Sequence, residues 1–212
     1  MTSQAAALPK DTEPAAMAGA RAGTQPLRII LIRHGKPAIA TSPRTSHREF
    51  RTYIDDYEDA GLDPASAPPE ELQDLIGELE AVFTSGRKRA EESARVLAPK
   101  AELIVDPLFA ESPLASPRIP LLKMTVTKWA IVSRLMWYAG FSPKIEGYHK
   151  SKRRAKRAAE ILIARAQTTG GTALVAHGYF NYLIGIELRR RGFKQTGSHK
   201  AKYWNDVVYE RS

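Results

Sequence analysis

The chain has 212 residues, 43% hydrophobic and 26% charged, which is an ordinary globular composition with enough length for one buried core. It contains no cysteine, so disulfides and thiolate metal sites are excluded. Residues 1–26 carry as many acidic as basic side chains, so the formal net charge of +9 belongs to residues 27–212 and favours anionic partners. The sequence has no apolar run long enough to span a membrane and no secretory signal pattern, and we expect a cytoplasmic protein.

The chain is predicted to begin with a disordered leader. Residues 1–26 are rich in Ala, Thr, Gly and Pro and show no apolar periodicity, and one domain follows at residues 27–212. That domain starts with the run from Leu27 to Ile32, which is nearly all apolar and β-branched and is typical of a strand buried on both faces. The run leads into Arg33-His34-Gly35-Lys36-Pro37, where glycine and proline indicate a turn.

Strands and helices are then predicted in alternation. Further strands are expected at residues 81–84, 103–105 and 172–176, with a final edge strand at 203–209. Helices are expected over residues 86–98, with Ser85 placed to cap the first turn, and over residues 179–191. This alternation predicts an α/β protein: a three-layer α/β/α sandwich with a mainly parallel central sheet.

Two more segments have helical patterns. Residues 120–140 are rich in apolar side chains, so we expect a largely buried helix that either packs in the core or serves, within residues 112–148, as a cap over the site. A second helix is predicted from a buried stripe at helical spacing, formed by Ala155, Ala158, Ala159, Leu162 and Ala166. The basic run at residues 150–157 then forms the solvated face of that helix, and nucleic-acid binding through it is the alternative.

Two histidines follow predicted strands directly. His34 comes after the first strand and His177 after the strand at residues 172–176. Parallel sheets form their sites beyond the C-terminal ends of the strands. Neighbouring strands lie about 4.8 Å apart, so two adjacent strands would turn both imidazoles toward one pocket. The other histidines lack such a partner and are expected to be structural or exposed; they are His47, His149 and His199.

The turn sequence points to a family. Leu31-Ile32-Arg33-His34-Gly35 resembles the signature of the histidine phosphatase superfamily, which includes cofactor-dependent phosphoglycerate mutases. Residues 84–94 are similar to a strand-to-helix segment of that family, in which a serine is followed four positions later by Arg-Ala. This resemblance implies that Arg89 binds phosphate. Arg87 departs from the usual apolar residue, and we expect it to be solvated.

Two later segments complete the resemblance. Residues 106–111 are similar to the segment that delivers the family's proton-donor glutamate, here Glu111, although Ser112-Pro113-Leu114 replaces the usual continuation. Ala176-His177-Gly178 matches the second family histidine. The acid phosphatase branch has an aspartate after that histidine, so Gly178 places the resemblance with the phosphoglycerate mutase-like branch.

The implied roles agree with phosphate chemistry. Phosphoryl transfer spreads negative charge over several oxygens, and Arg33, Arg89 and His177 can supply fixed donors for them. His34 in its neutral form is a competent nucleophile, which would form a phosphohistidine. Glu111 can act first as general acid and then as general base. This scheme requires no metal and no cofactor.

The sequence leaves the function open among three alternatives. They are a metal-independent phosphomonoester hydrolase, a phosphomutase or phosphotransferase, and a non-catalytic phosphate- or nucleic-acid-binding module. The missing mutase-like continuation after Glu111 favours hydrolysis of a phosphorylated small molecule or phosphoprotein. Lys36 and Gly178 are further candidates for substrate binding, and a solvated turn position is the alternative for Lys36.

Overall fold

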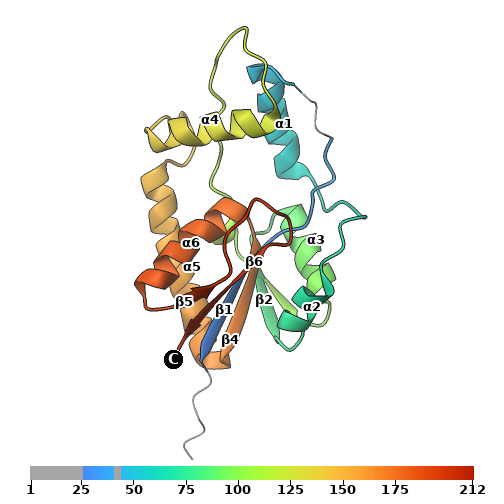
Figure 1. Cartoon of the computed structure of the whole chain (residues 1–212), viewed down its shortest axis with the longest axis vertical. Coiled ribbons are helices and arrows are strands. Elements are labelled where there is room, and N and C mark those ends of the chain that lie inside the picture. Colours follow the sequence, from blue (N-terminus) through green and yellow to red (C-terminus); the bar gives the residue numbers. More distant parts are fainter. Residues whose placement is uncertain (1–25, 41–43) are drawn as a thin grey trace, which may run out of the picture.

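The structure is a computed structural model that describes residues 26–40 and 44–212, so the leader predicted at residues 1–26 lies, except for Pro26, outside the described residues. The described chain folds around a six-stranded sheet with the order β3-β2-β4-β1-β6-β5 (Figure 1). The strands are β1 (Leu27–Arg33), β2 (Ala81–Thr84), β3 (Glu102–Val105), β4 (Gly171–Ala176), β5 (Lys194–Thr196) and β6 (Asp206–Arg211). The helices are α1 (His47–Asp59), α2 (Glu70–Ile76), α3 (Lys88–Leu97), α4 (Val126–Tyr138), α5 (Tyr148–Thr169) and α6 (Gly178–Arg190), with a 3-10 turn at Pro107–Phe109.

The sheet is mainly parallel and lies between two layers of helices. β1 pairs with β4, β4 with β2, and β2 with β3, all in parallel, whereas β6 runs antiparallel to β1 and to β5. Helices α5 and α6 lie on one face, and α2 and α3 lie on the other (Figure 1). The predicted three-layer α/β/α fold is therefore confirmed.

Strand β1 contributes to the core on both of its faces. Ile29 and Leu31 belong to the cluster formed with α5 and α6, while Ile30 and Ile32 belong to the cluster formed with α2 and α3. Successive side chains of a strand point to opposite faces, so a continuous apolar run is buried only where both faces are covered. Packing on two sides holds the end of β1 firmly, and the Arg33-His34-Gly35 turn begins there.

The final strand differs from its prediction. β6 spans Asp206–Arg211 and lies inside the sheet between β1 and β5, so it is not the edge strand expected at residues 203–209. The edge strands of the described sheet are β3 and β5. β5 has only three residues, Lys194–Thr196, and none of them is apolar, so its pairing comes from the neighbouring strand rather than from a local pattern.

Helices α1 and α4 lie beyond the C-terminal ends of the parallel strands β1, β2 and β4 (Figure 1). They pack on each other through Phe50 and Trp129, whose rings are stacked with centroids 5.7 Å apart. Trp129 also donates its indole N–H to the carbonyl oxygen of Thr45 at 2.8 Å. The helix predicted over residues 120–140 is shorter in the structure, where α4 spans Val126–Tyr138. It is also not largely buried as expected, because Ile131 and Leu135 on its outer face are 55% and 62% exposed.

Helix α5 confirms the predicted buried stripe, since Ala155, Ala158, Ala159, Leu162 and Ala166 are all buried. The basic run before the stripe is not uniformly solvated. Arg154 is largely buried and ion-paired with Glu146 at 2.7 Å, whereas its neighbour Arg153 is exposed. Among residues 26–40 and 44–212, no helix combines the length and apolar character needed to cross a membrane.

Candidate active site

His34 lies at the end of β1 in a defined orientation. Its Nδ1 is 2.7 Å from the carbonyl oxygen of Gly35, which can only accept, so Nδ1 carries the proton. In the neutral ring this leaves a lone pair on Nε2. Gly35 is required here because a β-carbon would collide with Trp204 and Leu62, and its N–H donates to Ser93 Oγ at 2.9 Å.

His177 stands beside His34 because β4 is the parallel neighbour of β1. Arg33 pairs with Ala176 in the register, and the two imidazole centroids are 5.2 Å apart. Nε2 of His177 is hydrogen-bonded to Ser85 Oγ at 2.7 Å, and its buried Nδ1 has no partner. The expectation that two strand-end histidines meet is confirmed. The expectation that Ser85 caps α3 was wrong, since that helix starts at Lys88 with no side-chain cap.

Both histidines are held in the neutral form. Burial lowers the pKa of His34 to about 3, and Arg89 and Arg33 act in the same direction, whereas the hydrogen bond to Gly35 raises it. Burial keeps the pKa of His177 well below its usual range, and repulsion between its protonated form and a protonated His34 or the charged Arg89 lowers it further. Buried groups lose the hydration that stabilises a charge, and nearby guanidinium groups repel a proton. A neutral His34 retains its nucleophilic lone pair.

Two arginines present unused donors close to these rings. Arg89 is completely buried and donates Nη1 to the carbonyl oxygen of Tyr57 at 2.6 Å, while its Nε and Nη2 have no hydrogen-bond partner. Arg33 donates Nη1 to the carbonyl oxygen of Ala201 at 2.7 Å, and its Nε is also buried without a partner. Buried donors without an acceptor are costly, so these atoms are suited to an anionic ligand.

Glu111 is held at the beginning of α6. Its Oε1 accepts from the backbone N–H groups of Ser112 and Phe180 at 2.8 and 2.9 Å, and its Oε2 accepts from Tyr179 at 3.3 Å. The exposed N–H groups of a helix N-terminus favour a carboxylate. Glu111 also shares the wall of a cavity with Arg33. The structure thus places Glu111 near Arg33, with its carboxylate bound to the N-terminus of the helix that follows His177.

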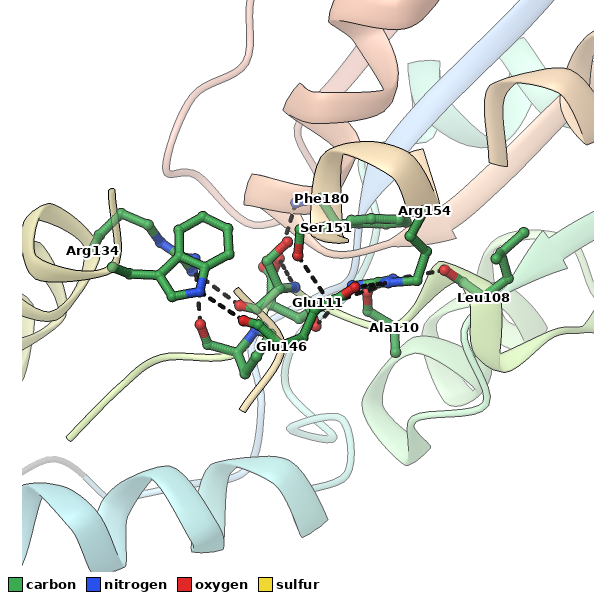
Figure 2. Close-up of polar contacts among 11 residues, drawn as sticks. Leu108, Ala110, Glu111, Arg134, Glu146, Ser151, Arg154 and Phe180 are labelled. Atoms are coloured by element: carbon green, nitrogen blue, oxygen red, sulfur yellow. Dashed lines mark hydrogen bonds and ion pairs between the residues drawn. The ribbon is translucent and has the colours of Figure 1, made fainter. Parts of the chain in front are cut away.

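The backbone on both sides of Glu111 is held by two arginines. Arg154 of α5 donates Nη1 to the carbonyl oxygens of Leu108 and Ala110, both at 2.7 Å. Arg134 of α4 donates Nη2 to the carbonyl oxygen of Ser112 at 3.0 Å. Figure 2 shows these two side chains approaching the Glu111 segment from opposite sides, with Glu146 bound to Arg154. A segment without regular structure is thereby fixed by side chains instead of a backbone ladder.

Two tyrosines cover His34. The Tyr57 hydroxyl lies 3.4 Å from Nε2 of His34, and the Arg89 guanidinium carbon lies 4.3 Å from the centre of the Tyr57 ring. The Tyr203 ring centre is 5.9 Å from that of His34, and the Arg33 guanidinium lies over its face at 4.5 Å. With His34 only 1% exposed, a ligand that reaches Nε2 must displace the Tyr57 hydroxyl.

Tyr57 was not among the predicted site residues, because helix α1 was not predicted from the sequence. A signal was present, since Ser46 and Glu49 form a capping box at 2.6 and 3.4 Å. The apolar side chains that follow have helical spacing. They are Phe50, Tyr53, Ile54 and Tyr57. Arg134, Arg154 and Tyr203 carry no comparable local signal, because their roles come from contacts with distant segments.

Lys36, Gly178 and Arg87 were also singled out in the sequence. Lys36 is exposed and ion-paired with Asp63 at 3.0 Å, so its substrate role stays a prediction. Gly178 begins α6, where a β-carbon would lie 3.2 Å from Arg33 Cδ, so its missing side chain makes room for that arginine. Arg87 is 42% exposed but bound to Glu58 at 2.6 Å, so it is less free than expected.

The other histidines lie outside the pair formed by His34 and His177. His149 is exposed and His47 is partly buried. His199 is bonded to the Tyr209 hydroxyl at 2.8 Å. Within the part of the chain that the structure describes, no group of three or more His, Cys, Asp or Glu side chains is arranged to hold a metal.

Together these features define an α/β protein with two neutral histidines and two arginines gathered at one end of a parallel sheet. The chain belongs to the histidine phosphatase superfamily, branch 1, whose family model matches residues 29–197. The resemblance noted in the turn sequence is therefore confirmed. None of the curated proteins matches the sequence.

Solved structures share the fold at low sequence identity. A mycobacterial glucosyl-3-phosphoglycerate phosphatase is 17% identical with a TM-score of 0.57, covering 85% of this chain and 90% of its own. Phosphoserine phosphatase from Entamoeba histolytica is 16% identical with a TM-score of 0.52, covering 85% and 89%. Phosphoglycerate mutase from Bacillus anthracis is 13% identical with a TM-score of 0.54, covering 88% and 89%. Phosphatases as well as a mutase thus share this architecture.

Proposed function

We propose that the protein hydrolyses phosphate monoesters through a phosphohistidine on His34. The observation that carries the proposal is a set of buried nitrogens without hydrogen-bond partners around that ring: Nε of Arg33, Nε and Nη2 of Arg89, and Nδ1 of His177. The nearest carboxylate oxygen to Nη2 of Arg89 belongs to Glu58 and is 3.8 Å away, which is too far for a hydrogen bond. An anion with several oxygens would satisfy all of them, and phosphate matches the planar fork of an arginine. The phosphatases of similar fold support the same assignment.

The first step forms the phosphoenzyme. The ester phosphate displaces the Tyr57 hydroxyl, and Nε2 of His34 attacks phosphorus while the bond to the alcohol oxygen breaks. Arg33, Arg89 and His177 stabilise the charge on the oxygens in transit. Glu111 gives a proton to the departing oxygen, so the product leaves as a neutral alcohol.

The second step releases phosphate. A water molecule attacks the phosphorus of phosphohistidine and gives its proton to Glu111, and the P–N bond breaks. Inorganic phosphate leaves, His34 returns to its neutral form with the proton on Nδ1, and Glu111 is protonated for the next cycle. The positive field in this scheme comes from the arginines, so the reaction needs no metal ion.

The test is chemical trapping of the intermediate in the presence of EDTA. The wild-type protein is incubated with p-nitrophenyl phosphate labelled in its phosphoryl group, and acid-labile, base-stable label on the protein is measured alongside phosphate release. His34→Ala should abolish both, whereas His149→Ala, at an exposed histidine, should change neither. Normal turnover by His34→Ala would refute the nucleophile, and activity lost in EDTA and restored by a divalent ion would refute the metal-free scheme.

Hydrolysis and transfer are separated by the products. A hydrolase releases inorganic phosphate from the labelled enzyme at the same rate with and without added alcohols. A phosphomutase would pass the label to a phosphorylated acceptor instead.

A further inference from the structure

A cavity of about 390 Å³ lies between α1, α4 and the end of the sheet. We call it the α1–α4 cavity. Its wall includes Arg33, Tyr57 and Tyr203, the residues that surround His34. A phosphate group bound at His34 would therefore extend its ester oxygen and alcohol part toward this space.

The wall of the α1–α4 cavity is rich in aromatic and aliphatic groups. Helix α1 contributes Tyr53 and Ile54, one turn before Tyr57. Helix α4 contributes Val126 and Ala130, which are four residues apart and so lie on one face of the helix. Ring centroids of Tyr53 and Tyr57 are 5.9 Å apart, and burial raises the pKa of Tyr53 to about 12, so its hydroxyl stays neutral.

Arg33 and Glu111 line the cavity where it meets the phosphate site, and the other two charged side chains of its wall, Glu58 and Arg134, already have partners. Glu58 is bound to Arg87 at 2.6 Å. Arg134 donates to the carbonyl oxygen of Ser112, and its guanidinium lies 4.0 Å from the centre of the Tyr179 ring. Engaged charges offer little to a further polar ligand, and a polar group placed against apolar walls without a partner loses its hydration at a cost. What remains for a ligand is largely apolar contact.

We propose that the α1–α4 cavity binds the alcohol part of the substrate and that this alcohol is apolar and contains a ring. The inference rests on the proposed function, since it needs the phosphate at His34. Tyrosine faces favour a flat ring through offset or edge-to-face contact, and apolar surface removed from water stabilises the complex. A compact polyhydroxylated alcohol would place its hydroxyl groups against a wall that is mostly apolar, where few of them find partners.

The test compares two primary alkyl esters whose alcohols differ in polarity. 2-Phenylethyl phosphate and glycerol 3-phosphate both carry a phosphate monoester on a primary carbon, so neither is an activated aryl ester. Their Kd values are measured by calorimetry on His34→Ala, which cannot turn them over. We expect 2-phenylethyl phosphate to bind about 30-fold more tightly, the gain expected when a phenyl ring leaves water for an apolar pocket. Equal Kd values, or tighter binding of glycerol 3-phosphate, would overturn the inference.

A pair of variants tests whether the preference for 2-phenylethyl phosphate arises in the α1–α4 cavity. Ala130→Phe fills the α1–α4 cavity and should weaken 2-phenylethyl phosphate by about 10-fold more than glycerol 3-phosphate. Ile131→Phe, at the next position on the outer face of α4, should leave both Kd values as they are. A similar loss for both esters in Ala130→Phe would place the alcohol elsewhere.

Turnover by the wild-type protein keeps the two proposals apart. Preferential binding of 2-phenylethyl phosphate without hydrolysis would support the cavity assignment and refute the proposed function. Hydrolysis of both esters with no preference in Kd would do the reverse.

Discussion

The Ser85 hydroxyl lies 2.7 Å from Nε2 of His177 and links the end of β2 to the end of β4. Ser85 Oγ also accepts the backbone N–H of Arg87 at 3.3 Å, so its own proton is available for Nε2. This arrangement places the proton of a neutral His177 on Nδ1, the buried atom without a partner. His177 then enters the site as a hydrogen-bond donor.

Ser85→Ala is expected to lower kcat/KM by about 10-fold or more, because Nε2 loses its partner and the ring loses its orientation. The matched control is Thr84→Val, which removes a neighbouring buried hydroxyl that has no hydrogen-bond partner. Steady-state kinetics and Tm are measured for both variants. Similar kinetics for the two would show that the contact between Ser85 and His177 does not matter for turnover.

Substitutions of Arg87 and Arg89, near the start of α3, should differ sharply in their effect on kcat/KM. Arg89→Lys keeps a charge at a fully buried position but removes the planar fork, and we expect kcat/KM to fall by about 10² or more. Arg87→Lys, at a 42% exposed side chain, should cost less than about 10-fold. The check is kcat/KM for one alkyl ester together with phosphate Kd. The opposite ranking would mean that Arg87 is the phosphate ligand.

Stability should depend on pH through His34. Its folded pKa of about 3 lies below the value of 6.5 in the unfolded chain, so only the unfolded state takes up a proton between these values. The contribution of a neutral His34 to the free energy of unfolding is therefore fully present above pH 6.5. It is lost as the pH decreases toward 3, by about 1.4 kcal/mol per pH unit for one proton.

His34→Gln removes this contribution. Urea unfolding from pH 4 to 8 should show a slope below pH 6 that is shallower in His34→Gln than in the wild type by about 1.4 kcal/mol per pH unit. Part of the slope remains in the variant, because the pKa of His177 is lowered as well. Parallel curves for the two proteins would show that His34 is not held neutral by the fold.

Arg154 should act on turnover through Glu111. Arg154→Met removes the donors to Leu108 and Ala110 before that glutamate, and Arg153→Met removes an exposed charge from the same helix as a control. We expect Arg154→Met to slow an alkyl ester by about 10-fold or more and an aryl ester less, because only a poor leaving group needs the acid. The variant also leaves Glu146 without its partner, so Tm is measured in parallel.

A double mutant separates positioning from general damage. If Arg154 acts by holding Glu111, then Arg154→Met should add little to the loss caused by Glu111→Gln with the alkyl ester. Additive losses in the double mutant would assign Arg154 a structural role only.

Much of the fold could be predicted because its signals are local. The apolar run of β1 is continuous because this strand is buried on both faces. The apolar stripe of α5 has helical spacing because this helix is buried on one face. Helix α1 also had such a pattern, with a capping box from Ser46 to Glu49, and was missed. β5 had none, since Lys194–Thr196 is a strand only through its pairing with β6.

By itself the sequence determined the chemistry available to this protein: an Arg-His-Gly turn after a buried strand, a second histidine after another strand, and the family that these residues define. Tertiary structure decided which groups act on one another. Ser85 bonds to His177 rather than capping a helix, Tyr57 covers His34, and Arg154 holds the backbone before Glu111. These contacts join residues 23 to 92 positions apart, so they depend on how strands and helices pack and leave no local pattern in the chain.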